Sequence, residues 1–350
     1  MKILAIETSC DETGAAVVER KIGEQTVRVL SNVTATSIAI HAATGGIVPE
    51  NAAREQVKYI IPTIDQALKK ANISLSQIDA LALTYGPGLI GSLLIGVETA
   101  KTLSFVLNKP LVPVNHLLAH IFANFIRNTK YLILNTRALF PFIGLIVSGG
   151  HTDLLLFKSL TNYKWLGGTR DDAAGEALDK IGRLLNLTYP AGAEIEQRAS
   201  KDQNMKSKIQ FKSPLIDSDD FDFSFSGLKT EVARFIGQKH LTEKLKDEIC
   251  YSLQAAIFGV LVKKTIRAAK LFEVNSIVLG GGVSANRTLR EQFELKIKSE
   301  KLKIKVFAPD KIYATDNAAM IGSYAALNYK PIPWEKVTAE PELYFGECYN

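Results

Sequence analysis

The sequence has few of the residues and motifs that define several common protein classes. Its 350 residues include only three cysteines, Cys10, Cys250 and Cys348, and these form neither a CxxC pair nor a closely spaced framework. Such usage is typical of a reducing compartment. The apolar run after Lys2 ends at Glu7, which is too short for a signal peptide. We therefore expect a cytoplasmic protein.

Signatures of the common nucleotide-binding folds are also missing. There is no GxxxxGK[ST] loop and no GxGxxG at a helix start, which argues against a P-loop NTPase and a Rossmann dehydrogenase. The uncharged stretch 80–97 has nearly the length of a membrane span. Gly86-Pro87-Gly88 interrupts it, so a short strand followed by a helix is the better prediction.

Composition describes a globular chain with ample core, since 47% of residues are hydrophobic and 22% are charged. Its length favours two domains. Lys and Arg exceed Asp and Glu by 42 − 36 = 6. This balance permits an acidic partner such as nucleic acid without requiring one.

Hydrophobic periodicity predicts the same order of elements twice. The first copy has strands at 2–8, 13–20 and 26–36, a helix at 50–71, a strand at 78–84, a helix at 89–107, a strand at 111–114 and a helix at 116–127. The second has strands at 140–147, 152–158 and 162–166, a helix at 171–186, a long helix at 249–272, a strand at 276–279, a helix at 285–299, a strand at 303–307 and a helix at 315–328. We expect a first lobe at 1–135 and a second at 136–350, with a helical insertion at about 190–272. The helix at 315–328 could pack back on the first lobe.

Strands that alternate with helices predict an α/β fold with a mainly parallel sheet. A duplicated unit that begins with an antiparallel hairpin resembles the actin-like fold of sugar kinases and the Hsp70 ATPase. That resemblance implies two lobes with a nucleotide in a central cleft. Three glycine-rich turns would face such a cleft, at Glu7–Gly14, Ile146–Thr152 and Gly280–Asn286, because glycine lets backbone N–H groups approach an anion.

Two histidines, His116 and His120, lie four residues apart in a predicted helix. Residues at this spacing share a helix face, so both rings could reach one metal ion. Alternatively, they merely form hydrogen bonds at a domain boundary. A zincin protease would need HExxH, and Leu117 occupies the position of its glutamate. Asp316 is a candidate third ligand, although its local sequence favours a plain helix N-cap.

Together these motifs resemble the bacterial type of the tRNA N6-adenosine threonylcarbamoyltransferase family, once described as O-sialoglycoprotein endopeptidases. The resemblance covers nearly the whole chain. It rests on IETSCDETG, GGIVPE, YGPGLIGSLLIG, NHLLAH, IVSGGHT, DDAAGEALDK, FSFSGLKT, GGGVSANRTLR and TDNAAMIG. The chain departs from the family's usual pattern at Leu178, at Ala191, and in the segment Glu50–Gln56, where the family motif EXASRXH ends in histidine. Of these, Ala191 could tighten the substrate pocket.

The resemblance implies a metal-dependent acyltransferase of t6A biosynthesis. It would move the threonylcarbamoyl group from threonylcarbamoyl-AMP to N6 of adenosine 37 in tRNAs that read ANN codons. It implies one Fe²⁺ or Zn²⁺ held by His116, His120 and Asp316, and a catalytic role for Asp11 and Glu12. Implied partners are tRNA, an inactive paralogue of the same fold and a small ATPase, with no membrane. The adenylate would contact Ile146, Val147, Ser148, Gly149, Gly150, Asp179, Gly192, Glu196 and Asn286.

Two other functions remain as alternatives. A non-catalytic scaffold of the same fold would hold a nucleotide but no stoichiometric metal ion. An endopeptidase is disfavoured by Leu117.

Overall fold

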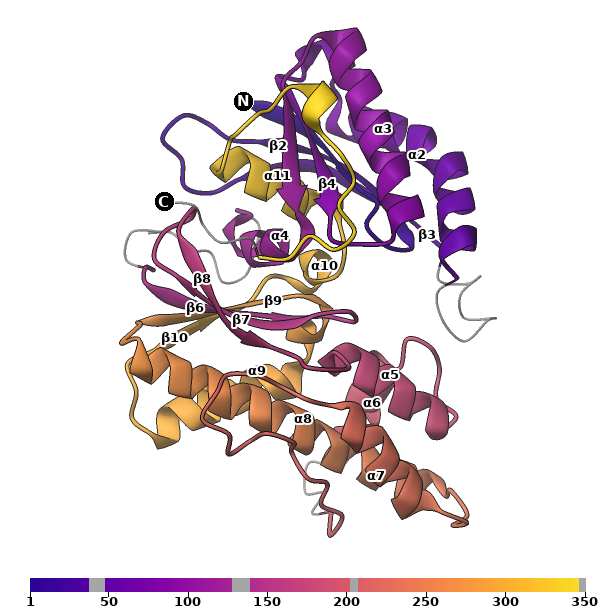
Figure 1. The fold of residues 1–350 in the computed structure, drawn as a ribbon, viewed down its shortest axis with the longest axis vertical. Helices are drawn as coiled ribbons and strands as arrows, with labels where there is room; N and C mark the ends of the chain where they lie inside the picture. Colours follow the sequence, from indigo (N-terminus) through magenta and orange to yellow (C-terminus); the bar gives the residue numbers. More distant parts are fainter. Residues whose placement is uncertain (38–47, 128–138, 202–206, 346–350) are drawn as a thin grey trace. The chain divides into compact units, whose positions relative to one another are not determined.

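The computed structural model describes residues 1–37, 48–127, 139–201 and 207–345. Contacts divide the chain into two compact units, Met1–Ala138 with Pro309–Asn350 (unit 1) and Leu139–Ala308 (unit 2). Each is built on one sheet (Figure 1). The expected boundary at 135/136, the first part of the GGIVPE motif and Cys348 lie outside the described residues.

Unit 1 has a five-stranded sheet in the order β3-β2-β1-β4-β5. Strands β1, β2 and β3 are antiparallel neighbours, while β4 and β5 continue the sheet parallel to β1. The strands are β1 (Lys2–Glu7), β2 (Glu12–Glu19), β3 (Arg28–Thr36), β4 (Ala80–Gly86) and β5 (Leu111–Asn115). The helices are α2 (Pro49–Ala71), α3 (Ile90–Leu107), α4 (His116–Phe122), α10 (Lys311–Ala314) and α11 (Ala318–Leu327).

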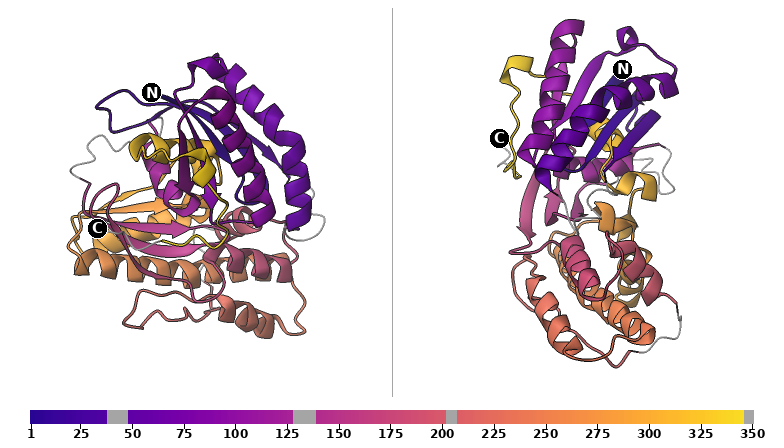
Figure 2. Two further views of the ribbon diagram at one scale, coloured as in Figure 1. Left: turned by 45° about the horizontal axis from the view of Figure 1, so that its top comes forward. Right: turned by 90° about the vertical axis from the view of Figure 1, so that its right-hand side faces the viewer.

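Both faces of this sheet are buried, and alternation along each strand decides which residues face which layer. Leu4 and Ile6 of β1 join the apolar cluster that includes residues of α2 and α3. Ile3 and Ala5 join the cluster that includes α11. Figures 1 and 2 show α2 and α3 side by side, with α11 across the sheet from them. The helix expected at 315–328 therefore belongs to unit 1.

Unit 2 repeats this connectivity in the order β10-β9-β6-β7-β8. Strands β6, β7 and β8 are antiparallel neighbours, and β9 and β10 are parallel to β6. The strands are β6 (Phe142–Val147), β7 (Thr152–Phe157), β8 (Tyr163–Gly168), β9 (Ser276–Gly280) and β10 (Lys305–Phe307). The helices are α5 (Ala174–Leu184), α6 (Gly192–Ala199), α7 (Ser226–Ile236), α8 (Glu243–Leu271) and α9 (Arg287–Ser299). The expected duplicated α/β fold is thus confirmed, but each sheet is mixed rather than mainly parallel, because its first three strands are antiparallel.

Several predicted helices start or end elsewhere than expected, and the largest shift is that of α8, which begins at Glu243 rather than at residue 249. Helix α4 stops at Phe122 rather than near residue 127, because Ile126 pairs with Val27 and draws the chain into a bridge. Helix α5 begins at Ala174, since Asp171 binds the start of α7 instead. Helix α11 begins at Ala318, after its N-cap Asn317.

Two described helices are long and apolar enough to cross a membrane by length and composition, α3 and α8. The most apolar stretch of α8 is 78% buried within the fold, which is the behaviour of a core helix. The corresponding stretch of α3 is 33% buried.

Candidate functional site

The histidine pair is positioned by the junction of β5 and α4. Asn115 ends the strand and caps the helix, because its Oδ1 accepts hydrogen bonds from the backbone of Leu117 (2.9 Å) and Leu118 (3.2 Å). His116 is therefore the first helical residue and His120 lies one turn later. The ring centroids are 4.7 Å apart, and both side chains are buried.

Asp316 reaches the same place from the loop between α10 and α11. The neighbouring Asn317 caps α11, with Oδ1 accepting from the backbone of Met320 (3.1 Å). The N-cap of α11 is therefore Asn317, and the alternative role of Asp316 as a helix N-cap is wrong. Its Oδ1 lies 3.5 Å from Nε2 of His116 and 3.4 Å from Nε2 of His120.

These three side chains fit a divalent cation. One ligand atom from each lies within 4.8 Å of the others. His120 is fully buried, and neither ring nitrogen has a hydrogen-bond partner among the described residues. Buried polar atoms are normally paired, so a buried imidazole without a hydrogen bond, whose Nε2 lies 3.4 Å from a carboxylate oxygen, is expected where an ion binds. The Asp316 side chain keeps 30% exposure, which leaves that side open to a substrate oxygen.

Glu7, at the end of β1, completes the centre and received no role from the sequence. Its Oε2 lies 3.1 Å from Nδ1 of His116, and it also accepts from Thr84 Oγ1. Its Oε1 accepts from the backbone of Ser9 (2.6 Å). A carboxylate on the far nitrogen fixes the tautomer that presents Nε2 to a metal. The signal in the sequence is a buried charge that ends an apolar strand.

Charge coupling within the centre follows from this geometry. Burial works against a charged His116, but the negative charges of Glu7 and Asp316 outweigh it and raise the pKa of His116 well above its usual value. Burial alone would raise the pKa of Asp316, yet both histidines hold it well below the ordinary range. Burial lowers the pKa of His120, and the charge on His116 adds to that effect. His120 is thus favoured as a neutral ligand.

Asp11 and Glu12, the candidate catalytic pair, lie in the same unit where the turn after β1 leads into β2, and Glu12 is the first residue of β2. Glu12 is partly buried, and burial raises its pKa to about 8, with the charges of Asp316, Asp11 and Glu7 adding to the shift. A carboxyl group that keeps its proton near neutral pH is suited to acid–base work.

The candidate adenylate contacts all lie in unit 2, around the ends of β6 and β9. Val147 lies against Gly281, whose φ of +91° and lack of Cβ allow the close approach. The turn at Ser148 and Gly149 is packed against Gly175 at the start of α5.

Two further contacts link the helices of this region. Asp179 Oδ1 accepts from the backbone of Ala191 (2.7 Å), just before Gly192. Glu196 Oε1 accepts from the backbone of Arg287 (2.7 Å), and Asn286 caps the same helix, α9. Asp179, Glu196 and Asn286 therefore have structural partners that the sequence did not predict.

Two details refine the expectations for this region. The backbone N–H of Ser148 donates to His151 O (2.9 Å), so it is already engaged within the turn. Gly149 and Gly150 are exposed. The Ala191 side chain is 2% exposed and faces Gly182, so its methyl group is buried in unit 2 rather than left open to a ligand.

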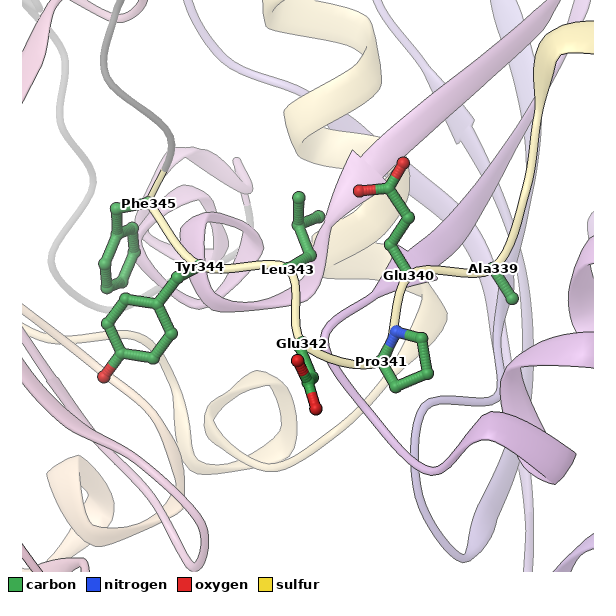
Figure 3. A pocket seen from close by; sticks show the side chains of 7 residues that line it. All are labelled: Ala339, Glu340, Pro341, Glu342, Leu343, Tyr344 and Phe345. Atoms are coloured by element: carbon green, nitrogen blue, oxygen red, sulfur yellow. The ribbon is translucent and has the colours of Figure 1, made fainter.

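A cavity of about 630 Å³ lies elsewhere in unit 1, formed by the C-terminal segment from Ala339 to Phe345 (Figure 3). The carboxylates of Glu340 and Glu342 point in different directions from it, and the rings of Tyr344 and Phe345 lie together. None of the candidate metal or catalytic residues lines this cavity.

Solved structures with the same fold confirm the actin-like architecture. The chain aligns with HypF of T. kodakarensis at a TM-score of 0.60 and 15% identity, over 94% of this chain and 48% of that one. It aligns with the activator of the 2-hydroxyisocaproyl-CoA dehydratase from Clostridium difficile at a TM-score of 0.50 and 14% identity, over 93% and 94% of the two chains. At these identities the likeness concerns the fold alone.

Sequence relatives are much closer. The tRNA N6-adenosine threonylcarbamoyltransferase of Persephonella marina is 46% identical over 324 residues, which cover 92% of this chain and 88% of that protein. The enzyme of the same name from Clostridium kluyveri is 45% identical over 333 residues, covering 94% and 93%. That from Sulfurihydrogenibium is 48% identical over 323 residues, covering 92% and 88%.

The model of one protein family, described as TsaD, tRNA N6-adenosine threonylcarbamoyltransferase, matches residues 28–323. This match takes in both histidines, Asp316 and the whole of unit 2. The chain therefore belongs to the tRNA N6-adenosine threonylcarbamoyltransferase family and is an enzyme of tRNA modification.

Proposed function

We propose that the chain transfers the threonylcarbamoyl group from threonylcarbamoyl-AMP to N6 of adenosine 37 in tRNAs that read ANN codons. In this proposal one Fe²⁺ or Zn²⁺ is held by His116, His120 and Asp316. When bound, the ion would supply Lewis acidity toward a carbonyl oxygen of the donor.

One observation supports the metal most strongly. His120 is buried with neither ring nitrogen hydrogen-bonded among the described residues, and its Nε2 and that of His116 both point at one oxygen of Asp316. Glu7 occupies the far nitrogen of His116, so this glutamate orients a ligand and is badly placed to act as a hydrolytic base. That placement favours a transferase over the peptidase alternative.

The acidic pair of unit 1 would handle the proton in this reaction. A bond forms between N6 of the adenosine and the carbamoyl carbon, and the bond from that carbon to the phosphate oxygen breaks. AMP leaves with the electron pair. The proton lost from N6 passes to the carboxylate form of Asp11 or Glu12. Burial raises the pKa of Glu12 to about 8, so the ionised form of this residue holds the proton that it takes up at neutral pH.

Unit 2 would bind the adenylate donor. Gly149 and Gly150 leave the turn after β6 without side chains, which suits close approach of a phosphate. Asp179, Gly192, Glu196 and Asn286 lie on α5, on α6 and at the start of α9, and Ile146 and Val147 end the strand beside them. We propose these residues as the walls of the adenylate site.

We further propose that the enzyme works in the cytoplasm with tRNA, an inactive paralogue of the same fold and a small ATPase. The free thiols of Cys10 and Cys250 agree with a reducing compartment. The family membership supports tRNA as the substrate.

The test is reconstitution with purified partners, threonylcarbamoyl-AMP and unmodified tRNA, measuring modified adenosine by mass spectrometry. We expect the wild-type chain to bind one metal ion and to modify the tRNA, and His116→Ala to lose both properties. If His116→Ala transfers as fast as the wild type, the metal assignment is wrong.

A further inference from the structure

Hydrogen-bond donors from other parts of unit 1 hold the turn that carries Asp11 and leads into Glu12. Ser9 O accepts from the backbone of Leu89 (2.8 Å), and Cys10 O accepts from Ser92 Oγ (2.7 Å). Asp11 O accepts from Ser37 Oγ (2.6 Å). Three consecutive carbonyl groups are therefore taken up by partners from other parts of the unit.

Gln56 of α2 contacts this turn at two points. Its Nε2 lies 3.1 Å from Cys10 O and 2.9 Å from Glu12 O, so one amide group spans the residue between them, Asp11. Both partners are carbonyl oxygens and can only accept, which fixes the orientation of the amide without ambiguity.

The chemistry of this position favours an amide. An amide NH₂ group carries two N–H donors, whereas a neutral imidazole has one. Gln56 is 1% exposed, and its Oε1 has no hydrogen-bond partner among the described residues. A buried, unpaired oxygen is unfavourable, so the side chain is poorly explained as a stabilising core residue. Its two donated bonds are its evident contribution.

We infer that Gln56 is a positioning residue, which holds the backbone on both sides of Asp11 and so fixes where the Asp11 and Glu12 carboxyl groups point. Ser37 and Ser92 support the same turn from its other carbonyls. The inference rests on the proposed function in assigning chemistry to the acidic pair. The hydrogen bonds from Gln56 to the backbone of the turn do not depend on catalysis, so their effect on the turn can be measured without an activity assay.

Gln56→Met tests this, because methionine keeps the length and volume of glutamine and removes both donors. Gln66→Met is the matched control, since Gln66 is an exposed glutamine of the same helix. Both variants are made in the full chain, loaded with metal and assayed with the partner proteins. We expect the kcat of Gln56→Met to fall on the order of tenfold to a hundredfold, with the KM for threonylcarbamoyl-AMP within about twofold. Gln66→Met should match the wild type.

Two measurements separate positioning from general loosening. Amide hydrogen exchange of the segment 8–14 should speed up in Gln56→Met and stay unchanged in Gln66→Met. The double variant Asp11→Asn with Gln56→Met should be no slower than Asp11→Asn alone, because a residue that acts through Asp11 has nothing left to position.

The outcomes distinguish the inference from the function on which it rests. Unchanged exchange in segment 8–14, or a double variant slowed by the full product of the single effects, overturns the positioning role. A different outcome is that exchange rises in Gln56→Met while Asp11→Asn and Glu12→Gln remain fully active. In that case Gln56 does position the turn, and the proposed catalytic role of the acidic pair is wrong.

Discussion

Glu7 is buried with a charge because donors surround its carboxylate, namely the backbone of Ser9, the Thr84 hydroxyl and the His116 ring. Burial raises its pKa, but the His116 charge and hydrogen bond outweigh burial and leave the pKa lowered. The carboxylate is thus available to orient His116. Residues of this kind tune a metal site without touching the ion.

Glu7→Gln should weaken metal binding by roughly tenfold to a hundredfold while the fold is retained, because the amide keeps the shape but loses the charge that orients the imidazole. Competition with a chelator of known affinity, followed by metal analysis, measures the change. Glu98→Gln removes an exposed carboxylate of α3 and serves as the control. Equal affinity in Glu7→Gln and wild type would exclude a role for Glu7 in metal binding.

The raised pKa of Glu12, about 8 against an ordinary value of 4.5, makes the stability of the metal-free chain depend on pH. Between these values the folded state holds a proton that the unfolded state has released, so the free energy of unfolding falls as pH rises. The favourable contribution is complete below about pH 4.5 and is lost by about pH 8.

Glu12→Gln should therefore flatten the pH dependence in this window and make the metal-free chain more stable than wild type at pH 8. Urea unfolding at several pH values measures this. Parallel curves for variant and wild type would contradict the shift.

At the level of elements, the turn between β9 and α9 depends on Gly281. Its φ is +91°, and an added Cβ would collide with the carbonyl oxygen of Val147 in β6. We expect Gly281→Ala to destabilise unit 2 by about 1–3 kcal/mol from backbone strain, with the collision adding to this.

Gly149→Ala, where nothing lies within 4 Å of an added Cβ, should change stability much less. Native-state hydrogen exchange of β6 and β9 reports both effects. Equal stability of the two variants would show that the turn relaxes to accept a side chain.

Periodicity was sufficient to predict the strands and the longer helices, because both faces of the unit 1 sheet and the core of unit 2 are apolar. It failed at helix ends that are determined by hydrogen bonds to residues far away in the sequence. Asp171 looked like the start of α5, yet it accepts from the backbone of Phe225 and Ser226 at the start of α7, more than fifty residues away. Such pairings leave no local signal.

The same limit applies to the site. The His116–His120 spacing and the motif around Asp316 were enough to suggest the ligands. The roles of Glu7 and Gln56 became visible only in the structure, because each depends on a residue far away in the sequence. Glu7 contacts His116, which is 109 positions away, and Gln56 contacts Cys10, which is 46 positions away.

At the level of the whole molecule, all three candidate ligands belong to unit 1, although they come from both of its chain segments. A ligand that binds only the folded state stabilises it by about 2.7 kcal/mol at a hundredfold excess over Kd. Chelation should therefore lower hydrogen-exchange protection in α4, α11 and β1, while α8 and β9 of unit 2 keep theirs. Equal loss in both units would show that they unfold as one.

The two chain segments of unit 1 are synthesised at different times, because unit 2 lies between them in the sequence. On the ribosome, Pro309 follows Ala138 by 309 − 138 = 171 residues, a delay of roughly 10–30 s at usual elongation rates. During that time the nascent sheet lacks α11, and the apolar face with Ile3 and Ala5 stays uncovered and open to chaperones. Because Asp316 follows all of unit 2 in the sequence, a chain that has not been synthesised past this residue lacks one of the three candidate metal ligands.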